Sequence, residues 1–132
     1  MRNLALILSL SGAAIAASAE TPISPEAFEA LTTGKTFSYG TGGTAYGAEE
    51  YLPNRRVRWS FLDGDCFEGR WYAEGSQICF IYDGIDDLQC WQFFQDGARL
   101  TARFKNNPDA TQIFEINREE ERLYCKGPDA GA

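Results

Sequence analysis

The sequence contains no histidine among its 132 residues. Histidine supplies the imidazole base of Ser-His and Cys-His catalytic sites, so its absence excludes sites of that kind. The chain also lacks a Cys-x-x-Cys pair, which is typical of thiol oxidoreductases and of many structural zinc sites. We therefore predict no metal, no cofactor and no enzymatic activity. A carboxylate pair among the 19 acidic residues is the catalytic alternative that the sequence leaves open.

Positive charge is scarce as well. Lysine and arginine total 12 against 19 acidic residues, and the formal net charge is −7. A chain of this charge is repelled by phosphate backbones and by anionic membrane surfaces. We therefore predict that the protein does not bind nucleic acid.

Only one long hydrophobic run occurs, and it lies at the N-terminus. Arg2 precedes an apolar stretch over residues 4–17, and small residues end the segment at Ala19. This pattern predicts a signal peptide over residues 1–19 that is cleaved after Ala19. A membrane anchor is the alternative, but spanning a bilayer takes about 20 predominantly apolar residues. We expect an exported protein, periplasmic or secreted, with no membrane insertion after cleavage.

The remaining chain predicts one domain over residues 20–125 and a flexible tail over residues 126–132. Ser24 and Pro25 are typical of a helix start and predict a short helix over residues 25–32. Short aromatic and β-branched runs then follow, separated by glycine-containing turns. The predicted fold is mainly β, an antiparallel up-and-down meander that forms a small barrel or half-barrel, with one short N-terminal helix.

Four cysteines occur, at positions 66, 79, 90 and 125. An even number in an exported chain predicts disulfides, with a zinc site as the alternative. In the stretch QICFIYDGIDDLQCW, a loop over residues 83–86 places Cys79 opposite Cys90 on paired strands, within disulfide range. Cys66 then pairs with Cys125 by elimination. The acidic residues of the loop lack the ligand spacing of an EF-hand calcium site.

The alternation of apolar and polar residues predicts how neighbouring strands pair. A three-residue turn over 63–65 would pair Val57 with Trp71, and a four-residue loop over 73–76 would place Trp71 opposite Ile78. Both arrangements keep the apolar residues on one face of the sheet. A turn at Asp96 and Gly97 would pair Phe93 with Leu100.

This apolar face is rich in aromatic residues. If the barrel interior is hollow, it could bind a small molecule; the alternative is that its own side chains fill it. The candidate interior ligand lining consists of Trp59, Phe61, Trp71, Phe80 and Trp91.

The opposite face of the same strands carries a cluster of charged residues. Three arginines and a tyrosine could bind an acidic partner surface or an anion. A cross-strand ladder of ion pairs on a solvated face is the alternative. The candidate partner face consists of Arg56, Arg58, Glu68, Arg70 and Tyr72.

The segments TGKTFSYG, YGAEEYLPNRRVRW and GRWYAEGSQICFIY, with the later Cys-Trp pair, resemble a family of small exported uncharacterised proteins of Gram-negative bacteria with a lipocalin-like β meander. The resemblance covers residues 31–104 and implies the meander and the Cys79–Cys90 disulfide. It implies no catalytic residues and no substrate. A looser similarity in fold, compartment and size links the chain to periplasmic barrel inhibitors of proteases or lysozymes.

Three functions are compatible with these observations. We expect a non-enzymatic binding domain that recognises a protein or a cell-envelope component, with inhibition of an enzyme as one form of that role. The alternative is a lipocalin-like carrier of a small apolar or anionic ligand. The third is an enzyme that uses a carboxylate pair. The sequence does not determine the partner or the oligomeric state, although a monomer is favoured.

Overall fold

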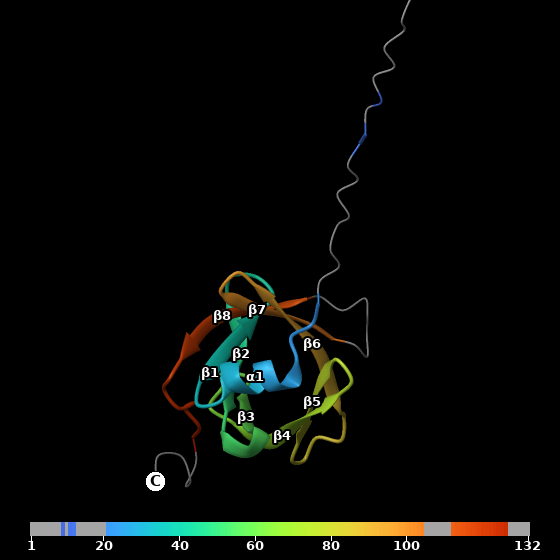
Figure 1. The fold of residues 1–132 in the computed structure, drawn as a ribbon. Helices are drawn as coiled ribbons and strands as arrows, with labels where there is room; N and C mark the ends of the chain where they lie inside the picture. Colours follow the sequence, from blue (N-terminus) through green and yellow to red (C-terminus); the bar gives the residue numbers. More distant parts are fainter. Residues whose placement is uncertain (1–8, 10, 13–20, 105–111, 127–132) are drawn as a thin grey trace, which may run out of the picture.

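A computed structural model describes residues 9, 11–12, 21–104 and 112–126. Within these residues, eight antiparallel strands form a closed barrel in which each strand pairs with the next along the chain and the last pairs with the first (Figure 1). The predicted antiparallel meander with one short helix is confirmed. The elements in chain order are α1 (Pro25–Thr32), β1 (Thr36–Gly40), β2 (Ala45–Tyr51), the 3-10 turn η1 (Pro53–Arg55), β3 (Arg56–Ser60), β4 (Phe67–Glu74), β5 (Gln77–Tyr82), β6 (Gln89–Asp96), β7 (Arg99–Phe104) and β8 (Ile113–Glu119).

The predicted signal peptide, residues 1–19, lies mostly outside the described residues, as does the predicted tail after Lys126. Lys126 itself donates a backbone hydrogen bond to the Gly64 carbonyl at 2.7 Å. In the described part of the chain, no helix has the length and hydrophobicity needed to cross a bilayer.

Helix α1 begins where the sequence predicts. The Ser24 hydroxyl accepts a hydrogen bond from the Ala27 amide at 3.1 Å, which satisfies one of the free donors at the helix N-terminus. After the helix, Gly34 has φ of +85° and donates its amide to the Tyr51 carbonyl at 2.8 Å. This contact joins the helix end to β2.

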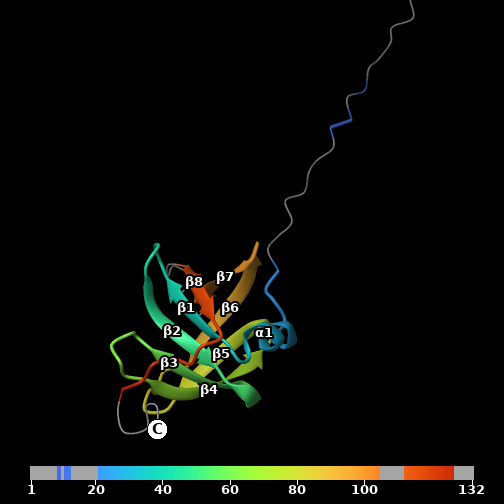
Figure 2. The same ribbon diagram turned by 90° about the vertical axis from the view of Figure 1, so that its left-hand side faces the viewer.

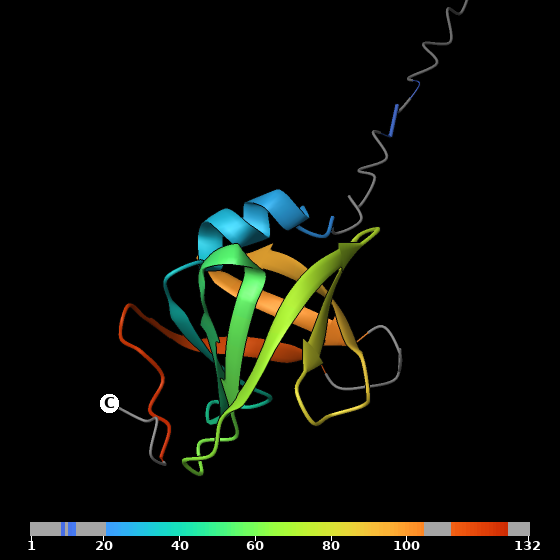
Figure 3. The ribbon, with the colours of Figure 1, turned by 90° about the horizontal axis from the view of Figure 1, so that it is seen from below.

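The helix lies across one end of the barrel and closes it (Figure 3). Phe28 points from the helix into the barrel, where its side chain is completely buried. Its ring lies 5.5 Å from that of Tyr51, 5.2 Å from that of Trp71 and 4.6 Å from that of Phe93, measured between centroids. Aromatic packing therefore fills the helix end of the interior.

The opposite end of the barrel is bordered by loops. Because the strands alternate in direction, the β1–β2, β3–β4 and β5–β6 loops all lie at the end away from α1 (Figure 3). The segment after β8 returns toward β3 and β4 (Figure 2). There the Cys66–Cys125 disulfide attaches it to the β3–β4 loop, with the two Cα atoms 5.6 Å apart.

The hairpin disulfide also forms as predicted. Cys79 and Cys90 are directly opposed on β5 and β6, and their Cα atoms lie 4.0 Å apart. Both predicted cysteine pairs are therefore confirmed. Disulfides form and persist in oxidising compartments, so the two bonds indicate an extracellular or periplasmic environment.

Three predicted strand registers are wrong, each by two residues. Between β6 and β7, Phe93 pairs with Ala102 rather than Leu100. Val57 pairs with Gly69 rather than Trp71, and Trp71 pairs with Phe80 rather than Ile78. The β3–β4 connection spans residues 61–66 and is longer than the predicted turn, whereas the β4–β5 connection is a two-residue turn. An even shift keeps each side chain on its face, because strand side chains alternate with a period of two. The predicted inner and outer faces are therefore correct.

We expect Phe28→Ala to lower the free energy of unfolding by about 3–5 kcal/mol, since it removes a fully buried ring and leaves a cavity. Chemical denaturation followed by circular dichroism measures the change. Phe114→Ala is the control, because that ring points outward and is 38% exposed. An equal loss in the two variants would contradict the role of Phe28.

Replacing Cys79 and Cys90 together by alanine should cost about 3 kcal/mol of stability, because the disulfide limits the conformational freedom of the unfolded chain. The Cys66 and Cys125 double variant should lose more, about 4 kcal/mol, since that disulfide encloses a longer segment. Urea unfolding of both variants tests this order, and the reverse order would count against it.

Candidate ligand-binding site in the barrel interior

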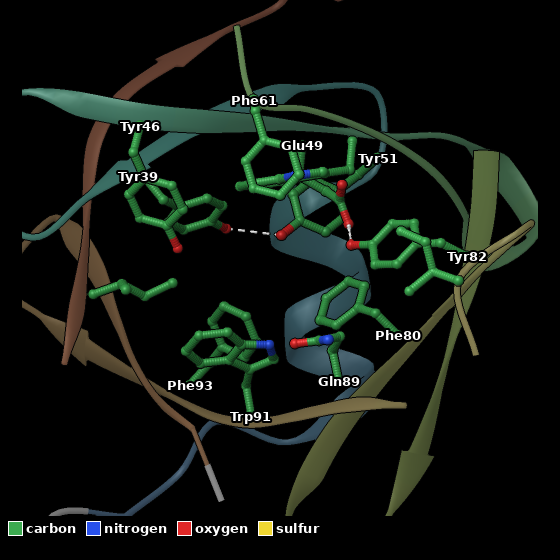
Figure 4. Close-up of a pocket in the computed structure, with 13 residues that line it drawn as sticks. Tyr39, Tyr46, Glu49, Tyr51, Phe61, Phe80, Tyr82, Gln89, Trp91 and Phe93 are labelled. Atoms are coloured by element: carbon green, nitrogen blue, oxygen red, sulfur yellow. Dashed lines mark hydrogen bonds between the residues drawn. The ribbon is translucent and has the colours of Figure 1, made fainter. Parts of the chain in front are cut away.

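The barrel interior contains a cavity of about 170 Å³ on the side away from the helix end. In Figure 4, α1 lies behind the cavity and the lining side chains converge in front of it. The lining comes from β1, β2, β3, β5, β6, β8 and two of the loops at the open end. Its residues are Tyr39, Tyr46, Glu49, Tyr51, Trp59, Phe61, Phe80, Tyr82, Ile85, Gln89, Trp91, Phe93 and Ile113.

Two inward-facing glycines make room for large rings in this lining. A Cβ atom on Gly47 would overlap the Trp59 ring. A Cβ atom on Gly69 would come within 2.8 Å of the Tyr82 ring and would also overlap the backbone of Ile81. The glycines on β2 and β4 therefore allow aromatic side chains of β3 and β5 to lie flat against the barrel wall.

The most unusual residue in the cavity is Glu49 on β2, whose side chain faces inward and is 2% exposed. Its Oε1 atom accepts a hydrogen bond from the Tyr82 hydroxyl at 2.6 Å (Figure 4). Its Oε2 atom is buried and has no hydrogen-bond partner among the residues that the structure describes. Burial raises the pKa of Glu49 to about 8, and the hydrogen bond from Tyr82 opposes part of that rise. Glu49 is therefore mostly protonated at neutral pH.

Tyrosine hydroxyls form the other polar part of the cavity. The hydroxyl groups of Tyr39 and Tyr51 lie 2.8 Å apart and share a hydrogen bond. Burial raises the pKa values of Tyr39, Tyr51 and Tyr82 above the usual range of a phenol. These groups therefore stay neutral and act as hydrogen-bond donors and acceptors.

None of the described residues that line the cavity has a basic side chain. A second buried acid, Glu115, does have a cationic partner: Arg118 lies 2.7 Å from its Oε1 atom. The same oxygen accepts a hydrogen bond from the Leu100 amide at 3.0 Å. Unlike Glu115, Glu49 has no cationic partner in the described part of the chain.

Four of the five aromatic residues predicted to line the interior do so: Trp59, Phe61, Phe80 and Trp91. Trp71 lies instead at the closed end of the barrel, against Phe28. The Arg55 guanidinium lies 4.3 Å from the centroid of its ring. Trp71 therefore belongs to the packing beneath the helix.

The five residues of the candidate partner face lie on neighbouring strands: Arg56 and Arg58 on β3, and Glu68, Arg70 and Tyr72 on β4. Arg58 contacts Glu68 at 2.6 Å and Glu50 at 3.3 Å, and Arg56 contacts Glu68 at 3.8 Å. These contacts form the cross-strand ion-pair ladder that the sequence offered as the alternative. Arg56 is nevertheless 64% exposed.

One cluster of potential metal ligands occurs among the described residues, formed by Glu74, Cys79 and Cys90. Both cysteines are joined in a disulfide. A metal binds the thiolate form of cysteine, so these sulfur atoms are not available as thiolate ligands.

Comparison with protein-family models, with curated proteins and with solved structures gives no match for this chain. The functional proposals therefore rest on the geometry of the barrel.

Sequence reasoning missed Glu49, which lies in the stretch YGAEEYL between two tyrosines. Adjacent acids in a short strand are typical of a solvated face, and Glu50 does lie on the outer face with Arg58. The available signal was alternation: Gly47, Glu49 and Tyr51 share one face of the strand. Only the strand register shows that this face is the inner one, because Glu49 pairs with the inward-facing Trp59 across β2 and β3.

We expect Glu49→Gln to raise the melting temperature relative to the wild type by an amount that grows with pH. An acid whose pKa is about 8 in the folded protein and about 4.5 when unfolded binds more protons in the folded state. The wild type therefore loses stability as pH rises between these values, with each unit of pKa difference equivalent to about 1.4 kcal/mol.

Thermal unfolding at pH 5, 7 and 8.5 tests this expectation. The difference between Glu49→Gln and the wild type should be small at pH 5 and largest at pH 8.5. Glu120→Gln, which changes an exposed side chain, is the control and should show no such trend. A difference for Glu49→Gln that is independent of pH would show that Glu49 titrates normally.

Proposed function

We propose that this protein is a non-enzymatic binding protein of the periplasm or extracellular medium, and that it binds a small molecule inside its barrel. The observation that supports this proposal is the aromatic cavity at the open end, which contains a buried and incompletely paired carboxyl group. Pockets that are mostly apolar and contain a few convergent polar groups are typical ligand sites.

The size of the cavity limits the size of the ligand. A dry cavity of about 150 Å³ can bind benzene, and the cavity here is about 170 Å³. The ligand should therefore have roughly six to twelve non-hydrogen atoms. A long acyl chain would exceed this space, so we favour a compact molecule with a ring or a branched apolar body.

Two exposed apolar residues, Phe61 and Leu62, lie in the β3–β4 loop and are 54% and 52% exposed. The Phe61 side chain also lines the cavity, so this loop borders its entrance. The Cys66–Cys125 disulfide holds one end of the loop, and the Leu62 amide donates to the Ser60 hydroxyl at 3.0 Å. These restraints favour an entrance whose shape is largely preformed.

Two other functional readings of the sequence have less support. On the candidate partner face, Arg58 donates to Glu68 Oε1 at 2.6 Å and lies 3.3 Å from Glu50, so this arginine is already paired within the sheet. The Oε2 atom of Glu68 has no hydrogen-bond partner among the described residues. An enzyme that uses a carboxylate pair needs two acids that face the same substrate. Among the described residues that line the cavity, Glu49 is the only acid.

Titration with single-ring compounds tests the proposed function. Benzylamine, benzyl alcohol and benzoate represent a cation, a neutral molecule and an anion of similar shape. At least one should bind with a stoichiometry of one and change the fluorescence of Trp59 and Trp91. If none of the three binds at millimolar concentration, the proposal fails.

Ile113→Phe should weaken the binding of the best of these compounds by tenfold or more, because the larger side chain fills the cavity. Phe114→Leu is the matched control on the outer face of the same strand and should bind as the wild type does. Calorimetric titration measures both affinities, and melting temperatures verify that both variants fold. Unchanged binding in Ile113→Phe would place the ligand outside the barrel.

A further inference from the structure

The proposed binding function leaves open which chemical class of ligand the cavity selects. The strongest evidence is the carboxyl group of Glu49, which belongs to the cavity lining and whose Oε2 atom is buried and has no hydrogen-bond partner among the described residues. Burying a polar atom without a partner costs free energy. While the acid is protonated, Oε2 carries the proton, because Oε1 accepts from Tyr82. Once Glu49 is deprotonated, Oε2 is an acceptor, and a ligand that donates a hydrogen bond to it would remove that cost.

We infer that the ligand is a small protonated amine whose ammonium group donates to Glu49 Oε2 while its apolar body packs against the aromatic wall. This inference rests on the proposed function, since it identifies the ligand of the same cavity. It differs from the anionic ligand considered from the sequence, because an anion would meet a carboxyl group and none of the described lining residues has a basic side chain.

The aromatic wall favours a cation over a neutral molecule of equal size. Trp59 lies directly opposite Glu49 on the neighbouring strand. Its ring is 5.9 Å from that of Tyr46 and 5.4 Å from that of Phe61. The electron-rich faces of such rings attract ammonium groups, most strongly where water is excluded.

The hydrogen-bonding groups around Glu49 also suit an ammonium, which has several donors and no acceptor. The Tyr82 hydroxyl already donates to Oε1, so Oε2 is the carboxyl oxygen left for the ligand. The phenol oxygens of Tyr39 and Tyr51 and the side chain of Gln89 supply further acceptors in the lining. A primary amine can use more than one of these groups.

Binding should be coupled to one proton. Burial holds the pKa of Glu49 at about 8, so before a ligand binds this acid is protonated in most molecules at pH 7. When the ammonium enters, Glu49 releases its proton to water and the amine keeps its own. No covalent bond forms or breaks in the ligand.

The tyrosines that face Glu49 do not gain or lose a proton near neutral pH, so they do not add to the pH dependence of binding. Tyr82 faces it from β5, Tyr39 from β1, and Tyr46 and Tyr51 lie on its own strand. Burial raises the pKa of each of these phenols above its usual value. Glu115 and Arg118, whose charges affect the pKa of Tyr39, form an ion pair with each other.

The test compares benzylamine, benzyl alcohol and benzoate by calorimetric titration at pH 8. The wild type should bind benzylamine about tenfold or more tightly than benzyl alcohol, and benzoate most weakly. Glu49→Gln should remove the preference for the amine and still bind benzyl alcohol. Glu50→Gln is the matched control, since the next side chain along β2 lies on the outer face with Arg58 and Arg122, and it should keep the preference.

A pH series supplies a second test that does not depend on the folding of Glu49→Gln. The affinity of the wild type for benzylamine should rise between pH 6 and pH 8, by up to about tenfold per unit while Glu49 is mostly protonated. A fall in affinity over this range would mean that the protonated acid is the binding form, and it would overturn the inference.

The outcomes separate this inference from the proposed function. Equal binding of benzylamine and benzyl alcohol, or tightest binding of benzoate, would overturn the amine while supporting a ligand site in the barrel. An amine preference that persists in Glu49→Gln would also overturn it. Failure of all three compounds to bind would remove the proposed function and this inference together.

Discussion

The packing of Phe28 against three aromatic rings is the interaction on which the rest of this structure depends. The interior of a small barrel must be filled by side chains or occupied by a ligand. Phe28 fills the helix end through its contacts with Tyr51, Trp71 and Phe93. Two of those rings, Tyr51 and Phe93, also line the cavity. The helix therefore turns the barrel into a cavity that is closed at one end, and the same residues stabilise the fold and shape the site.

The cavity combines this apolar packing with one costly polar group. An apolar side chain of similar size in place of Glu49 would avoid burying a carboxyl group whose second oxygen has no hydrogen-bond partner among the described residues. Retaining such a group at the expense of stability is typical of functional sites. The two disulfides and the closed hydrogen-bonding pattern of the barrel offset this cost elsewhere in the molecule.

Much of the fold could be predicted because its determinants are local. Ser24 and Pro25 mark the helix start, and alternation assigns the inner and outer faces of the strands. The register was harder, since a shift by two residues preserves the alternation; the length of the β3–β4 connection decided the pairing of Val57 with Gly69. Four of the five predicted lining residues could be found because aromatic residues on an inner face point into a barrel. The sequence could not show that Trp71 lies at the closed end of the barrel, because that end is defined by the position of α1.

The sequence by itself determined the strand pattern and the side of the sheet on which each aromatic residue lies, since these follow from alternation. It also determined the Cys79–Cys90 pair, which closes a short hairpin, and this left Cys66 and Cys125 as the second pair. Only the tertiary structure decided the environment of Glu49. Its partner Tyr82 is 33 residues away and three strands along the barrel. In an open sheet the inner side of β2 could face water, whereas in a closed barrel every strand has neighbours on both sides and its inner face is enclosed. Closure of β1 against β8 is therefore what turns an ordinary acid into a buried group at the centre of the candidate site.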